Sequence, residues 1–144
     1  MATERRAETV WQGDLMNGSG TIEQVGSGAF GPLDVSWPSR AEDPNGKTSP
    51  EELIAAAWAA CFAMALSNGL AKGDNPPEKL ETSATVAFQP GEGITRGALT
   101  VRGTVPGIDE QAFKDAADDA KQNCPVSKAL SGIPDVSLEA TLAQ

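Results

Sequence analysis

The chain has 144 residues, of which 40% are hydrophobic, and its 20 acidic and 11 basic residues give a formal net charge of −9. A chain of this length and apolar content can bury one packed core, so we expect a single globular domain over residues 1–144. The negative charge repels phosphate backbones and anionic lipid surfaces, which argues against nucleic-acid and membrane partners.

The first part of the chain predicts extended structure. Residues 4–11 and 20–25 carry β-forming side chains, and the Asn17-Gly18 turn signal lies between them, so we expect a hairpin. A third extended piece is expected over residues 30–37. Residues 38–47 are rich in Pro, Gly, Asp and Asn, which predicts a loop.

A long helix is expected next. It begins near Ser49-Pro50, where a hydroxyl side chain precedes a proline and two acidic residues follow. Residues 53–71 are apolar enough for a membrane span to be considered. Alanine supplies most of this run and Ser67-Asn68-Gly69 interrupt its end, so a helix buried inside the protein is the better interpretation. The N-terminus is charged and no apolar stretch follows it, which favours a cytoplasmic protein.

The remaining segments complete an α+β pattern. Residues 79–88 and 94–105 alternate between polar and apolar side chains, which predicts a second hairpin. Asp109 can cap an amphipathic helix, Pro125 can open a short helical piece, and a final strand follows Pro134. The expected order is β-β-β-α-β-β-α-β.

The chain has two cysteines and no histidine, which restricts its chemistry. A Cys-His nucleophile is excluded, and a structural zinc site usually needs four Cys or His ligands, so no metal is expected. The glycine-rich residues 18–20 and 26–28 do not precede a helix and are interpreted as turns, so no nucleotide cofactor is expected either. Taken alone, Cys61 in the long helix is a buried core thiol, whereas Cys124 precedes a helix start that can stabilise a thiolate.

Two segments carry a resemblance to a known family. SPEELIAAAWAACFAMAL (residues 49–66) and NCPVSKAL (residues 123–130) resemble, in the same order, the two cysteine motifs of the OsmC/Ohr family of osmotically inducible and organic hydroperoxide resistance proteins. VPGID and WQGDLMNGSG resemble its OsmC branch. The resemblance implies antiparallel sheets around a long central helix, in an intertwined homodimer. It also implies a peroxidase that reduces organic hydroperoxides, and hydrogen peroxide less well, to alcohols in defence against oxidative stress.

The resemblance also assigns catalytic residues. In the family the first cysteine attacks the peroxide and the second closes a disulfide, which correspond to Cys61 and Cys124. An arginine and a glutamate lie beside the reactive thiol, and the matching positions are Arg40 and Glu51, with Glu52 as a competitor for the glutamate. A guanidinium can stabilise a thiolate and a developing alkoxide, and a carboxylate can hold it in place.

Two aromatic residues are candidates for the substrate pocket. Trp58 stands where many relatives carry a smaller or polar aromatic residue such as histidine, and it lies one helical turn before Cys61. Phe62 follows Cys61 directly. Both are expected at the pocket, with plain core packing as the alternative for each.

The spacing of the candidates predicts a shared site. Glu51 and Cys61 are ten residues apart, which on a straight helix is about 15 Å, so one helix cannot bring both to one arginine. We therefore expect Glu51 of one subunit beside Cys61 of the other in a homodimer. Re-reduction requires an external dithiol, for which a lipoylated protein is the candidate that the family implies. The alternative function is a non-catalytic small-molecule-binding or structural domain on the same fold.

Overall fold

The computed structural model describes residues 2–143, which divide between Leu53 and Ile54 into two compact units. The first unit contains an antiparallel sheet of three short strands, β1 (Thr9–Gln12), β2 (Ser19–Ile22) and β3 (Leu33–Val35), in that order. The predicted hairpin and third extended piece are confirmed, although each strand is shorter than expected. Whether the whole chain folds as one domain stays a prediction.

A short helix, α1 (Trp37–Ala41), stands where the sequence predicted the end of a strand and the start of a loop. Ser36 and Ser39 form a reciprocal capping box: the Ser39 N–H donates to Ser36 Oγ at 3.2 Å, and the Ser36 N–H donates to Ser39 Oγ at 3.0 Å. Pro38 is accommodated in the first turn, where a backbone N–H is not needed. The prediction of irregular structure from residue 38 was therefore wrong for residues 38–41, because serine replaces the usual acidic partner of this motif.

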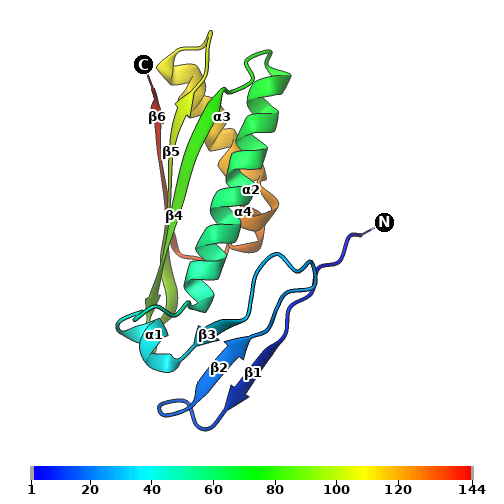
Figure 1. The fold of residues 1–144 in the computed structure, drawn as a ribbon. Coiled ribbons are helices and arrows are strands. Elements are labelled where there is room, and N and C mark those ends of the chain that lie inside the picture. Colours follow the sequence, from blue (N-terminus) through cyan, green and yellow to red (C-terminus); the bar gives the residue numbers. More distant parts are fainter. Residues whose placement is uncertain (1, 144) are drawn as a thin grey trace. The chain divides into compact units, whose positions relative to one another are not determined.

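The second unit combines one sheet with helices on one of its faces (Figure 1). The chain enters it within α2 (Pro50–Lys72) and continues through the hairpin of β4 (Lys79–Gln89) and β5 (Gly93–Thr104). Helices α3 (Glu110–Asn123) and α4 (Pro125–Ala129) then lead to β6 (Asp135–Leu142).

The sheet of the second unit is mixed, with the order β4-β5-β6. β4 and β5 are antiparallel, but β6 pairs with β5 in parallel. The expectation of antiparallel sheets is therefore corrected for this pair. The physical reason is that α3 and α4 form a crossover that returns the chain to the opposite end of the sheet, as parallel strands require.

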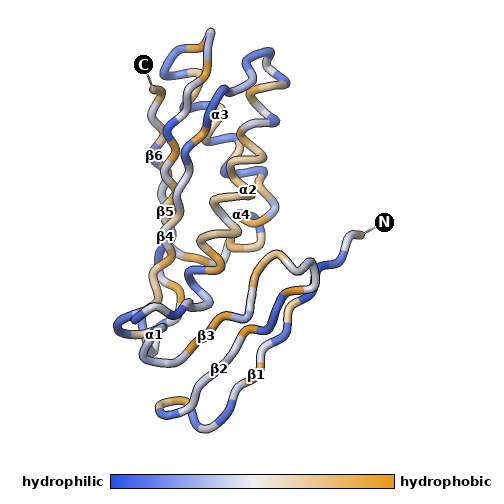
Figure 2. The backbone as a smooth tube through the Cα atoms, in the orientation of Figure 1, coloured by the Kyte–Doolittle hydropathy of each residue, from blue (hydrophilic) through white to orange (hydrophobic). Residues whose placement is uncertain are grey.

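The core of the second unit lies between the helices and the inner face of the sheet. From α2 it takes Trp58, Phe62, Leu66 and Leu70, which recur every four residues on one face of the helix. Buried and exposed residues alternate along β5, and the alternation of hydropathy is visible along the strands in Figure 2. Burying each large apolar side chain stabilises the fold by about 1.5–3 kcal/mol.

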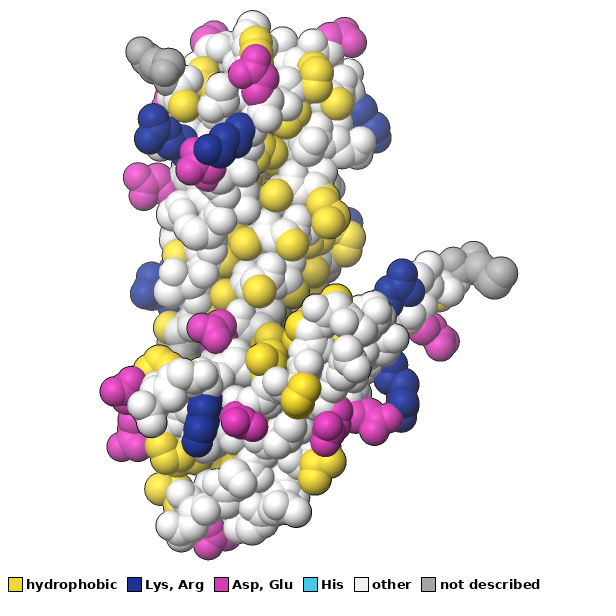
Figure 3. Space-filling view, in the orientation of Figure 1, with side chains coloured by type: hydrophobic (Ala, Val, Ile, Leu, Met, Phe, Trp, Pro, Cys, Tyr) yellow, Lys and Arg dark blue, Asp and Glu magenta, His cyan; other side chains and the backbone are white. Residues whose placement is uncertain are grey.

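The opposite face of α2 is apolar but exposed in the single chain. It carries Ala56, Ala60 and Met64, and the Met64 side chain is 72% exposed. Figure 3 shows hydrophobic side chains gathered over this helix. By length and composition α2 could also cross a membrane, a test that the core helix of a soluble protein passes too. The expectation of a buried helix is therefore confirmed for one face only.

Gly103 on β5 tests how tightly α3 packs on the sheet. A Cβ atom at this position would lie 2.5 Å from Cε1 and Cζ of the buried Phe113 ring. We expect Gly103→Ala to destabilise the protein by about 1–3 kcal/mol, measured by urea unfolding. The control is Gly69→Ala on α2, where a Cβ would meet no atom within 4 Å, and this change should stabilise the protein by about 0.5–1 kcal/mol. Equal stability of the two variants would contradict the described packing.

Candidate functional site

The two cysteines meet in the second unit. Cys61 lies in the middle of α2, and Cys124 lies at the junction of α3 and α4, 63 positions further along the chain. Their Sγ atoms are 2.7 Å apart and both thiols are free. A disulfide bond is about 2.05 Å long, so a small approach of the two sulfur atoms would join them.

The two thiols differ in their access to solvent. The Cys124 side chain is fully buried in the core, whereas Cys61 is partly exposed beside it. A small molecule arriving from solvent therefore meets the sulfur of Cys61 first.

The local backbone favours the thiolate of Cys124. This residue is the N-cap of α4, and Pro125 occupies the first turn. Burial opposes ionisation, but the hydrogen bond that Cys124 shares with Cys61 and the polar groups of Ser127 and Val126 outweigh it, so the pKa of Cys124 is lowered. These groups are the backbone N–H groups at the start of α4 and the Ser127 hydroxyl. The Cys124 side chain itself makes no capping hydrogen bond.

The pKa of the Cys61 thiol is shifted in the opposite direction. Burial and its interaction with Cys124 raise its pKa, and only the backbone N–H of Val126 acts in the other direction. Because the two sulfur atoms share a hydrogen bond, they lose their protons as a coupled pair. The pair loses its first proton from Cys124, so that the negative charge of the thiolate rests on the Cys124 sulfur.

Trp58 links α2 to Ser127 in the first turn of α4. Its indole N–H donates to Ser127 Oγ at 2.7 Å, and the residue is only 1% exposed. The ring lies over Gly97, where a Cβ atom would approach it to 2.7 Å. Sequence reasoning did not select Ser127, although its place three residues after a cysteine that precedes a proline is a signal for a helix-start contact.

The aromatic pocket candidates divide between pocket and core. Trp58 lines a cavity of about 300 Å³ with Lys121, Lys128 and apolar residues of the chain that follows α4. Phe62 is fully buried in the core cluster and is not among the residues lining that cavity. The core interpretation therefore describes Phe62, whereas Trp58 both fills the core and lines the cavity.

Arg40 and Glu51 form an ion pair in the first unit. Arg40 Nε lies 3.1 Å and 3.3 Å from the two carboxylate oxygens of Glu51, and Nη2 lies 2.9 Å from Oε2. The Glu51 side chain is only 7% exposed, which holds the guanidinium in a defined position. Glu52 instead accepts a hydrogen bond from Thr48 Oγ1 at 2.8 Å. Of the two glutamates, Glu51 is the one paired with the arginine.

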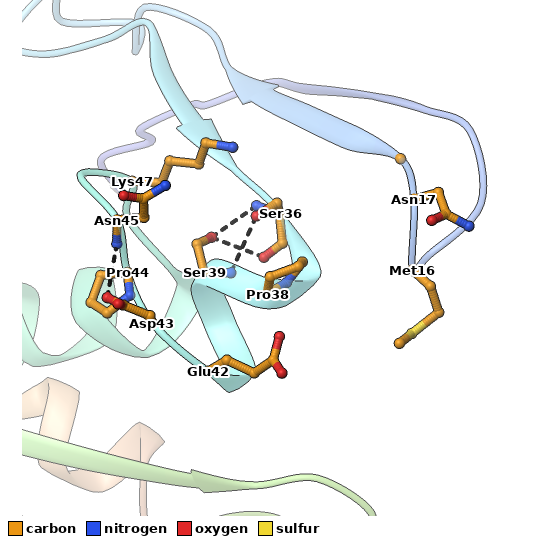
Figure 4. Close-up of a pocket in the computed structure, with 11 residues that line it drawn as sticks. Met16, Asn17, Ser36, Pro38, Ser39, Glu42, Asp43, Pro44, Asn45 and Lys47 are labelled. Atoms are coloured by element: carbon orange, nitrogen blue, oxygen red, sulfur yellow. Dashed lines mark hydrogen bonds between the residues drawn. The ribbon is translucent and has the colours of Figure 1, made fainter.

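The first unit also contains an open polar pocket of about 680 Å³ (Figure 4). Its walls include the Ser36 and Ser39 capping box and the loop of Glu42, Asp43 and Lys47. Neither Arg40 nor Glu51 is among its lining residues, and it contains no thiol. Within residues 2–143, no group of three or more His, Cys, Asp or Glu side chains is arranged to hold a metal ion.

The chain is similar over most of its length to proteins of one family. The OsmC-like protein family model matches residues 43–139. Peroxiredoxin OsmC of Escherichia coli (strain K12) is 38% identical over 133 residues, which cover 90% of this chain and 92% of that protein. The organic hydroperoxide resistance protein OhrB of Bacillus subtilis (strain 168) is 33% identical over 74% of this chain and 79% of that protein.

Solved structures show the same fold. The crystal structure of OhrB of Bacillus subtilis has a TM-score of 0.66 at 25% sequence identity, covering 96% of this chain and 98% of that chain. The crystal structure of an OsmC-like protein from Mycoplasma pneumoniae has a TM-score of 0.74 at 16% identity and covers both chains completely. The expected α+β fold of this family is thereby confirmed.

The paired thiols give a testable titration. We expect the reduced protein to lose its first thiol proton below the ordinary thiol pKa of 9.0 and its second above it, because the first thiolate is stabilised at the start of α4 and then opposes the second. The ultraviolet absorbance of the thiolate, followed against pH, measures both steps. A single step at the ordinary value, with both thiols ionising together, would contradict the coupled arrangement.

Proposed function

Because the chain belongs to the OsmC-like family, we propose that it is a thiol peroxidase that reduces organic hydroperoxides to alcohols through a Cys61–Cys124 disulfide. The observation that carries the proposal is the contact of two free sulfur atoms, one partly exposed and one buried, at 2.7 Å. Defence against oxidative stress is the physiological setting that this activity would serve.

Each step of the proposed cycle has an assigned sulfur. The Cys61 thiolate attacks the outer oxygen of the hydroperoxide, the O–O bond breaks, and the alkoxide takes a proton to leave as an alcohol. The Cys124 thiolate then attacks the sulfur of the Cys61 sulfenic acid, forms the disulfide and expels hydroxide. Cys61 suits the first step because it is the exposed thiol, and Cys124 suits the second because it lies in contact with it.

We assign the activation of Cys61 to Arg40. Within the second unit, burial and Cys124 both disfavour ionisation of Cys61, so a cation is needed to stabilise its thiolate. Arg40 is held by both oxygens of the buried Glu51 carboxylate. Its guanidinium would stabilise the thiolate and then the negative charge that develops on the departing alkoxide.

We propose that this arginine reaches Cys61 across a homodimer. Glu51 and Cys61 are separated by ten residues of helix, a rise of about 15 Å, so the ion pair of one subunit would serve the thiol of the other. The exposed apolar face of α2, with Ala56, Ala60 and Met64, supports an interface with a second copy, because small side chains allow two helices to approach closely.

The proposed cycle ends with reduction by an external dithiol. The chain has no third cysteine to reduce the disulfide itself. A dithiol attacks the exposed sulfur of Cys61, releases Cys124, and closes its own disulfide to free Cys61. A lipoylated protein is the proposed donor, and a cytoplasmic location, where dithiols stay reduced, is part of the same proposal.

The cycle predicts a defined change of mass. One equivalent of an organic hydroperoxide should remove both free thiols and lower the intact mass by two hydrogens, and dithiothreitol should restore both. In Cys124→Ser the first turnover should proceed and leave an oxidised Cys61, whereas Cys61→Ser should consume no peroxide. Thiol counting and intact mass spectrometry measure these outcomes. Peroxide that persists beside two free thiols would refute the peroxidase assignment.

The shared site predicts complementation between two inactive variants. We expect Arg40→Ala to lower the rate constant for peroxide by about 10²-fold or more, because a donor to the developing charge is lost. Cys61→Ser should be inactive. Co-expressed, the two variants should form mixed dimers that contain one intact site, restoring roughly a quarter of the wild-type activity for random pairing.

The control for this experiment is co-expression of Cys61→Ser with Cys124→Ser. Both of these changes fall in the same thiol pair. Neither subunit of the mixed dimer has both cysteines intact, so full turnover should not return. If the Arg40→Ala mixture also stays inactive while its dimers form normally, the arginine does not act across the interface.

A further inference from the structure

The hydrogen bond between Trp58 and Ser127 lies outside the proposed chemistry but beside one of its two thiols. Trp58 Nε1 is 2.7 Å from Ser127 Oγ, and Ser127 is three residues from Cys124 in the first turn of α4. An indole N–H can only donate, so the serine oxygen must accept this hydrogen bond. The hydroxyl hydrogen of Ser127 is then directed away from Trp58.

Cys124 is the N-cap of the same short helix, so its side chain lies one turn before that hydroxyl. The Ser127 hydroxyl acts on Cys124 together with the backbone N–H groups of Ser127 and Val126, and each of these contacts lowers the pKa of the thiol. The other group facing the sulfur is the Cys61 thiol of α2. The charged residues lining the neighbouring cavity are Lys121 of α3 and Lys128 of α4, and no carboxylate lines it.

We propose that Ser127 and Trp58 are positioning residues for Cys124: Trp58 holds the Ser127 hydroxyl so that it donates to the Cys124 sulfur. The inference rests on the proposed function, in which Cys124 reacts twice. It is the nucleophile that attacks the Cys61 sulfenic acid, and it is the leaving group when an external thiolate attacks the sulfur of Cys61. A hydrogen bond to the thiolate assists both steps, because it raises the thiolate fraction and stabilises the departing charge.

The surroundings of Trp58 accommodate a large aromatic side chain that carries a hydrogen-bond donor. Gly97 on β5 leaves room for the ring, since a Cβ there would approach Cζ3 and Cη2 to 2.7 Å and 2.8 Å. The buried ring therefore cannot turn freely, and the direction of its N–H is set by packing. A rigid donor of this kind sets the orientation of a serine hydroxyl that would otherwise rotate.

The first experiment measures the Cys124 thiol without peroxide. In a Cys61→Ser background, thiolate absorbance against pH should show a higher pKa of Cys124 after Ser127→Ala, and a shift in the same direction after Trp58→Phe. Ser127→Thr keeps the hydroxyl and should restore the parent titration. Ser137→Ala, an exposed serine on β6, is the control and should change nothing. An unchanged titration in Ser127→Ala overturns the proposal, even if Trp58→Phe fails to fold.

The second experiment separates the two steps of the cycle in the protein with both cysteines. In Ser127→Ala the sulfenic acid on Cys61 should form at the parent rate, but its conversion to the disulfide should be about tenfold slower, measured by trapping with a sulfenic-acid reagent. Equal slowing of both steps would overturn the assignment to Cys124. If the titration shifts as expected but peroxide leaves both thiols free, the proposed peroxidase function fails while the positioning of Cys124 stands.

Discussion

The contact between the sulfur atoms of Cys61 and Cys124 is the constraint on which the chemistry of this protein depends. It joins the middle of α2 to the α3–α4 junction, and both elements contribute to one buried core cluster, which includes Phe62 and Leu66 of α2 and Ala117 and Ala120 of α3. Thiol chemistry requires this degree of approach, because two sulfurs held further apart cannot form a bond without backbone movement. The core of the second unit therefore serves the thiol pair as well as stability.

The contact is asymmetric in exposure and in charge. Cys124 is buried yet lies at a helix start with Ser127 and Val126, which favours its thiolate, whereas Cys61 is reachable from solvent and harder to ionise. In the proposed cycle this asymmetry keeps the second thiol ready to resolve the first. In the proposed cycle a fixed cation would stabilise the Cys61 thiolate, and the bidentate Arg40–Glu51 pair has the rigidity for that role.

Several local elements could be predicted because their signals are local. The proline and acids at the start of α2, the Asp109 cap of α3 and the alternation in β4 and β5 each act within a few residues, and the structure has all three. Helix α1 was missed because its capping box uses Ser39 in place of an acid. The parallel pairing of β6 was missed because strand direction depends on the path of the intervening helices.

The chemical inventory follows from the amino-acid sequence alone: two thiols, no histidine, and motifs around Cys61, Cys124, Arg40 and Glu51 that resemble one family. Tertiary structure alone decided which atoms meet. It brought together sulfurs 63 positions apart, paired Arg40 with Glu51 and not with Glu52, and joined Trp58 to Ser127. The physical reason is that composition and periodicity report local preferences, whereas side-chain contacts between distant segments arise only when the core closes.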